Sequence, residues 1–115
     1  MNPLSRQGGI LSLQIRDLAT LQASYMLFIK RGGLFVPTQK KYPMGEEVFL
    51  LLSLLDEPEQ IPVSGRVVWM TPPGASGSRQ AGIGVQFAEG SSALQDHIEK
   101  RLAGLLASER PTYTL

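Results

Sequence analysis

Short segments with a two-residue hydrophobic period fill most of this chain up to Gly90, and turn-forming residues end each of them. In the run 81–88, Ile83, Val85 and Phe87 alternate with small or polar residues. Side chains of a β-strand point alternately to its two faces, so this run predicts a strand with one buried face. The predicted strands are 10–15, 34–36, 47–55, 61–70 and 81–88. Closely spaced strands followed by one helix favour an antiparallel barrel or sandwich over βαβ units.

The hydrophobic period changes to about 3.6 residues at Ser91, which predicts a single helix over about 91–108. Ser92 and Gln95 have the spacing of a capping box at the start of this helix. A helix with one apolar stripe packs that stripe against the rest of the domain. The residues of the stripe are Leu94, Ile98, Leu102, Leu105 and Leu106.

The composition excludes several classes of protein. The 115 residues suffice for one domain, which we place at 1–110 with a flexible tail at 111–115. A net charge of +1 gives no overall field that would draw the chain to nucleic acid. Cysteine is absent and His97 is the only histidine, so we expect no catalytic residue and no metal site. Without a signal peptide or an apolar run of about 20 residues, we expect a cytoplasmic, non-enzymatic monomer without cofactors and without membrane insertion.

The run 47–55 is apolar on both faces, although the interior of a barrel needs only one. Val48, Leu50, Leu52 and Leu54 form one face, and Phe49, Leu51 and Leu55 form the other. Leaving large apolar side chains in water forgoes about 1.5–3 kcal/mol each, so the second face needs a cover. We expect the C-terminal helix to lie over it.

The five apolar residues at 25–29 are the clearest candidate for a binding surface. They follow no strand period, so two or three of them are expected to point outward. Aromatic residues and Met are enriched at protein interfaces. Tyr25 is the strongest candidate, because a partner surface can bury its ring and satisfy its hydroxyl. A buried connection under the barrel rim is the alternative interpretation.

Two more segments are candidates for contacts. In the tail, Tyr113 and Leu115 can dock on a partner in an extended conformation, and a frayed terminus is the alternative. A basic patch is expected from four cations that flank one predicted hairpin, and it either solubilises the rim or contacts an anion weakly. These cations are Lys30, Arg31, Lys40 and Lys41.

Three short motifs give the chain a resemblance to the PilZ domain family. They are Gly-Gly-Leu-Phe-Val at 32–36, Gly-Arg-Val-Val-Trp at 65–69 and Gly-Ile-Gly-Val-Gln-Phe at 82–87. The resemblance extends from about residue 8 through the C-terminal helix. It implies a mainly β fold, a six-stranded antiparallel barrel with a C-terminal α-helix. Many members of the family bind cyclic di-GMP.

The residues with which those members bind the nucleotide are missing from the matching positions. Binding members carry Arg-x-x-x-Arg before the barrel, whereas Arg6 and Arg16 stand ten positions apart. They also carry Asp/Asn-x-Ser-x-x-Gly. When the glycine is matched to Gly33, Phe28 replaces the Asp or Asn and Lys30 replaces the Ser. Guanidinium groups hold phosphates and stack on guanine in ways that lysine does not reproduce. The resemblance therefore implies that direct binding of cyclic di-GMP is lost.

Short, single-domain members with such a degenerate pocket act in type IV pilus biogenesis and twitching motility. The resemblance to them implies a cytoplasmic adaptor in cyclic di-GMP signalling that works by protein–protein interaction. The implied partners are a PilB-like assembly ATPase and a FimX-like regulator with an EAL domain. The alternative is a receptor that binds cyclic di-GMP or another anion through the basic patch. The residues expected to contact partners are Tyr25, Met26, Phe28, Phe35, Tyr113 and Leu115.

Overall fold

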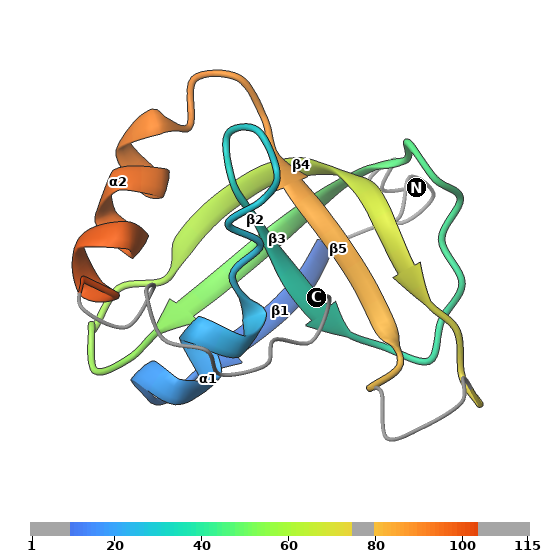
Figure 1. The fold of residues 1–115 in the computed structure, drawn as a ribbon, viewed down its shortest axis with the longest axis horizontal. Coiled ribbons are helices and arrows are strands. Elements are labelled where there is room, and N and C mark those ends of the chain that lie inside the picture. Colours follow the sequence, from blue (N-terminus) through green and yellow to red (C-terminus); the bar gives the residue numbers. More distant parts are fainter. Residues whose placement is uncertain (1–9, 75–79, 104–115) are drawn as a thin grey trace.

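One curled sheet carries most of the structure, a computed structural model that describes residues 10–74 and 80–103. Its five strands lie in the order β1-β3-β4-β5-β2 and curl into a half-barrel, with a helix near the end of β1 and another after β5 (Figure 1). The elements in chain order are β1 (Ile10–Ile15), α1 (Leu18–Ser24), β2 (Gly33–Pro37), β3 (Glu47–Leu54), β4 (Ile61–Thr71), β5 (Gly82–Phe87) and α2 (Ser92–Arg101).

The pairing of the strands corrects the expected six-stranded antiparallel barrel in two respects. The described residues form five strands, and β1 pairs with β3 in the parallel direction. The other pairs, β3–β4, β4–β5 and β2–β5, are antiparallel. Beside β2, Tyr25 forms an isolated antiparallel bridge to Leu34. The bridge does not grow into a strand, because Arg31 and Gly32 adopt positive φ angles of 69° and 79° and turn the chain back.

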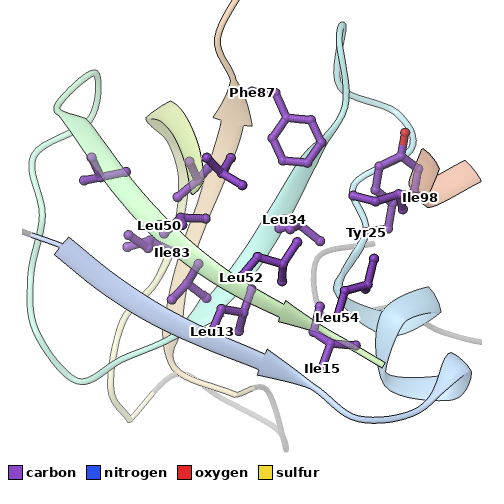
Figure 2. Packing of buried hydrophobic residues seen from close by; sticks show 14 of the residues in the cluster. Leu13, Ile15, Tyr25, Leu34, Leu50, Leu52, Leu54, Ile83, Phe87 and Ile98 are labelled. Atoms are coloured by element: carbon purple, nitrogen blue, oxygen red, sulfur yellow. The ribbon is translucent and has the colours of Figure 1, made fainter. Parts of the chain in front are cut away.

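The concave face of the sheet holds the hydrophobic core (Figure 2). Strand β3 alternates between buried and partly exposed residues along its whole length, as a two-residue period predicts. The inward sets predicted for 47–55 and 81–88 are confirmed. They are Val48, Leu50, Leu52 and Leu54 on β3, and Ile83, Val85 and Phe87 on β5.

Helix α2 closes the concave side of the half-barrel. Ile98 and Leu102 belong to the inner core, and Leu94 packs against it. The expectation that this helix covers the second face of β3 is therefore wrong for its described part, because the open side of the half-barrel takes the apolar stripe. Ser91, not Ser92, is the N-cap residue, and it makes no side-chain capping bond, so the predicted capping box is not formed. Residues 104–108 lie outside the described residues.

Strand β4 exchanges its two faces partway along. Val67 pairs with Val85 and Trp69 with Gly84, so Val68 is an extra residue in the ladder. A one-residue shift sends every later side chain to the opposite face. A strict alternation continuing from Val63 and Val67 would place Trp69 inside, but after the shift Trp69 lies on the outer face. A glycine within a strand, such as Gly65, predicts either a bulge or a close backbone approach. The structure has the close approach: a Cβ atom there would lie 2.4 Å from the carbonyl oxygen of Gln86.

Candidate functional site

A second, smaller cluster of buried side chains lies on the outer face of β2, β5 and β4. Met26 and Phe35 are fully buried, yet neither belongs to the inner core. A Cβ atom added at Gly84 would lie 2.7 Å from the sulfur of Met26 and from Cβ of Trp69. One added at Gly82 would lie 2.5 Å from Cζ of Phe35. The two glycines of β5 therefore make room for large side chains from neighbouring segments.

Residues 26–32, which we call the covering loop, lie over this outer cluster. Within the loop, the Ile29 amide donates to the Met26 carbonyl at 3.2 Å and the Gly32 amide donates to the Ile29 carbonyl at 2.8 Å. The sheet holds the loop at two further points. The Gln86 amide group donates to the Lys30 carbonyl at 2.9 Å, and Arg31 Nε donates to the Phe87 carbonyl at 3.1 Å. These bonds give the loop one defined conformation.

The tip of the covering loop presents two large apolar side chains to solvent. Leu27 is 51% exposed and Phe28 is 46% exposed. The rings of Phe28 and Trp69 make a T-shaped contact, with centroids 6.4 Å apart and an interplanar angle of 67°. One side of the Phe28 ring is thus fixed by packing while the other remains available for contact.

The structure buries three of the residues expected to face a partner. Tyr25 is 2% exposed, and Met26 and Phe35 are fully buried. The chain passes around the edge of β2 here, so Tyr25 enters the inner core beside Ile98 (Figure 2) while Met26 enters the outer cluster. The expectation of exposed side chains at these three positions is wrong. Tyr25 and Met26 are consecutive and pack on opposite faces of one sheet, and Phe35 packs in the outer cluster beside Gly82. Phe28 is the exposed member of the set, and Tyr113 and Leu115 lie outside the described residues.

The hydroxyl of Tyr25 has a partner inside the domain. It donates to Oε2 of Glu99 on α2 at 2.5 Å. Burial raises the pKa of Tyr25, and the hydrogen bond to the Glu99 carboxylate raises it further. Tyr25 therefore links the base of the covering loop to α2, which is a structural role.

A hollow of about 710 Å³ lies on the outer face beside the covering loop. Its floor comes from the outward residues of β3 and β4. Two guanidinium groups, Arg31 and Arg66, and two carboxylates, Glu47 and Glu89, line it. Sequence reasoning missed Arg66. The sequence signal that could have found Arg66 is its place as a polar residue between the apolar residues of β4. In the sheet it lies directly opposite Glu47 and Gln86 on the neighbouring strands.

The expected basic patch does not form one cluster around this hollow. Arg31 lines the hollow, whereas Lys30, Lys40 and Lys41 do not. The ammonium of Lys40 instead lies 5.8 Å from the centroid of the Tyr42 ring. The structure thus pairs Arg31 with Arg66 as the cations that a ligand in the hollow would meet.

The single histidine takes part in the polar side-chain contacts that attach α2 to the β3–β4 turn. His97 Nε2 lies 2.9 Å from Oε2 of Glu57, and Arg101 Nη2 lies 3.4 Å from Oδ1 of Asp56. Within the described ranges, no three His, Cys, Asp or Glu side chains gather in a way that would hold a metal ion. None of the helices in those ranges is long and apolar enough to span a bilayer.

A curled sheet with a fixed outer loop and an open hollow defines a small binding domain. The model of the PilZ domain matches residues 10–104, so the chain belongs to the PilZ domain family. Domains of this family are non-enzymatic and bind cyclic di-GMP or other proteins. No curated protein matches the chain.

Proposed function

We propose that this PilZ domain is a cytoplasmic, non-enzymatic adaptor in type IV pilus biogenesis and twitching motility. Its proposed partners are a PilB-like assembly ATPase and a FimX-like regulator with an EAL domain, and it acts without binding cyclic di-GMP itself. The observation that carries this proposal is the covering loop. The position that is Asp or Asn in nucleotide-binding members is here Phe28, which is 46% exposed.

The chemistry of the loop favours a protein partner over a nucleotide. Phe28 offers no hydrogen-bonding group to a base, and the Lys30 carbonyl is already occupied by the Gln86 side chain. Exposed apolar side chains next to a fixed backbone lose little conformational entropy when a partner covers them. Aromatic anchors of this kind contribute most of the binding energy of many interfaces. Leu27 and Phe28 together fit such an anchor.

The test is the affinity of each proposed partner for the Phe28→Ala variant, measured by biolayer interferometry. Phe28→Ala is expected to weaken the complex by at least about tenfold, because alanine removes the exposed ring of the anchor. Met44→Ala is the matched control, since Met44 is 62% exposed and lies outside the covering loop. It should leave the affinity unchanged. Equal affinities for wild type and Phe28→Ala, with both proteins folded, would contradict the proposed surface.

A second candidate function is a receptor for cyclic di-GMP or another anion in the hollow. The observation in its favour is that Arg31 and Arg66 both line the hollow. Glu47 and Glu89 line it too, and they weaken the attraction for an anion. Binding in the hollow would therefore be weak and sensitive to salt.

Calorimetry with cyclic di-GMP at low and at high salt tests this second function. Arg31→Asn is the suitable variant, because Asn tolerates the positive φ of 69° at this position. Lys41→Asn is the control, since Lys41 does not line the hollow. Micromolar binding that Arg31→Asn abolishes and Lys41→Asn preserves would favour the receptor over the adaptor. An absence of heat at low salt would argue against the receptor.

A further inference from the structure

The outer face of β1, β3 and β4 carries apolar side chains that the described chain does not cover. Ile10 is 47% exposed, Phe49 and Leu51 are partly exposed, and Pro62 is exposed. The inner side of the same strands is fully packed. We call this surface, which also includes Glu47, Ser64 and Arg66, the open outer face.

The strand register arranges the open outer face in rows. Glu47 lies opposite Arg66, and Leu51 lies opposite Pro62. The row between them pairs Phe49 with Ser64, and Ile10 extends it on β1. Each row thus joins a residue of β3 to a β4 residue of opposite charge or different shape.

The charged row is unsatisfied within the described part of the chain. Glu47 and Arg66 are exposed cross-strand neighbours, yet no ion pair within 4.0 Å joins either of them to another described residue. With respect to the described residues, this face therefore offers an unpaired carboxylate and an unpaired guanidinium on adjacent strands.

We propose that the open outer face is the interface of a symmetric homodimer. A two-fold axis parallel to the strands, running between β3 and β4, brings β3 of one copy over β4 of the other. Glu47 then faces Arg66 of the second copy, and the same pair forms again by symmetry. Leu51 faces Pro62 of the second copy, and Phe49 faces Ser64 of the second copy. Sheets that pack face to face at about 10 Å interdigitate large and small side chains in this way.

The hollow supports this arrangement. Ser64 is among its lining residues, and its small outward side chain contributes to the space of about 710 Å³. In the proposed dimer the ring of Phe49 from the second copy lies opposite Ser64 and enters that space. A knob and its hole are thus both present on one surface, which is what a self-complementary interface requires.

The mixed charge identifies a second copy as the occupant in preference to other molecules. A purely anionic ligand would meet Glu47 and Glu89 as well as the two arginines. A second copy instead satisfies both signs at once, and a net charge of +1 per chain produces little repulsion between copies. This inference replaces the expectation of a monomer and is independent of the adaptor role, because Leu27 and Phe28 are not part of the face.

The dimer is expected to be weak. Three strands spaced by about 4.8 Å give a face smaller than the roughly 800 Å² that a standard interface takes from each partner. We therefore expect dissociation in the micromolar range, which sedimentation velocity of the full chain detects over a concentration series.

A charge exchange tests the interface. Glu47→Arg and Arg66→Glu each place like charges against each other twice, so each is expected to raise the dissociation constant at least about tenfold. The double variant restores both pairs and should return the constant to within about threefold of wild type. Thermal midpoints at the lowest concentration report on folding separately. A wild type that stays monomeric throughout the series overturns the proposal, as does a double variant no better than the single ones.

A second measurement of the dimer uses two variants in which an exposed apolar residue is replaced by serine. Ile10→Ser, on the open outer face, is expected to weaken the dimer, whereas Leu18→Ser is not, because Leu18 is 41% exposed on α1, outside the face. A dimer that tolerates both Ile10→Ser and Glu47→Arg uses another surface, which overturns the proposal. Cyclic di-GMP bound in the hollow of a protein that remains monomeric would also overturn it.

Discussion

The outer surface of the sheet has two halves, and both carry large apolar side chains. The inward side chains of the same strands belong to the inner core. On the β2–β5 half, Phe35 and Met26 are fully buried. On the β1–β3 half, Phe49 stays partly exposed and Ile10 is 47% exposed. The strands themselves are alike, so the difference comes from their surroundings. Gly82 and Gly84 leave room on one half for a loop and its side chains, whereas the other half has no such segment among the described residues.

The comparison separates two uses of apolar surface. A face covered by the chain itself adds to the stability of the monomer, because its area leaves the water when the chain folds. A face left open adds little to folding, and its area is available when a second molecule binds. The covered half is thus expected to respond to mutation by unfolding, and the open half by loss of association.

The largest expected effect is on the covered half. Phe35→Ala should lower the free energy of unfolding by about 3–5 kcal/mol, because it empties a fully buried site. Phe49→Ala should lower it by less than half as much, since part of that ring is already in water. Urea unfolding at a low protein concentration measures both. Equal losses for the two variants would mean that the halves do not differ.

A close backbone approach gives the next largest effect. A Cβ atom at Gly82 would lie 2.4 Å from the carbonyl oxygen of Val36 and 2.5 Å from Cζ of Phe35. Because backbone cannot move aside cheaply, Gly82→Ala is expected to cost about 1–3 kcal/mol of stability. Ser12→Ala on the open half should change it by less than about 0.5 kcal/mol. A harmless Gly82→Ala would show that the outer cluster is loosely packed.

Much of the fold was predictable, because alternation and periodicity report directly on the inner core. The spans of β1, β3, β4 and β5 match the predicted strands to within one or two residues. The parallel pairing of β1 with β3 was not predictable, since the direction of a partner strand leaves no mark in the alternation. The bulge at Val68 was missed as well, because no local residue signals the register shift that moves Trp69 outward.

The candidate site was predictable only in part. The segment at 25–29 was correctly singled out as one that breaks the strand period, and the expectation that two or three of its residues point outward is confirmed by Leu27 and Phe28. Which of the five residues these would be was not predicted correctly. Tyr25 was misjudged because the sequence does not reveal that Glu99, 74 positions away, accepts its hydroxyl hydrogen bond. Arg66 was missed because a single outward cation on a strand is ordinarily only a solvated residue.

A smaller effect is expected where the chain passes from the inner core to the covering loop. Tyr25→Phe removes the hydrogen bond to Glu99 and should cost about 1–2 kcal/mol of stability at neutral pH. The folded state raises the pKa of Tyr25 above its ordinary value of 10.0, so it holds this proton more tightly than the unfolded state. The contribution is therefore complete below pH 10 and declines as the pH rises above it.

Urea unfolding of wild type and Tyr25→Phe below and above pH 10 checks this prediction. The difference between their free energies of unfolding should be smaller at the higher pH. Glu99→Gln completes a double-mutant cycle. The double variant should lose less free energy of unfolding than the sum of the losses of the two single variants. Additive losses would indicate that the Tyr25 hydroxyl does not act through Glu99.

The smallest effect is expected at Asp17, where the chain leaves β1 and starts towards the covering loop. The carboxylate of Asp17 accepts a hydrogen bond from the Thr20 amide at 2.7 Å, and this bond lowers the pKa of Asp17. Asp17→Ala should lower the thermal midpoint by about 2–4 °C, while Asp17→Asn, which still caps, should stay close to wild type. Because the folded pKa is depressed, the cap is complete above the ordinary value of 3.8 and is lost as the pH falls through the lowered value. The difference in thermal midpoint between wild type and Asp17→Ala should accordingly disappear at acidic pH. A loss at Asp17 as large as that of Phe35→Ala would mean that the local start of α1, and not the packing of the outer cluster, holds the covering loop on the sheet.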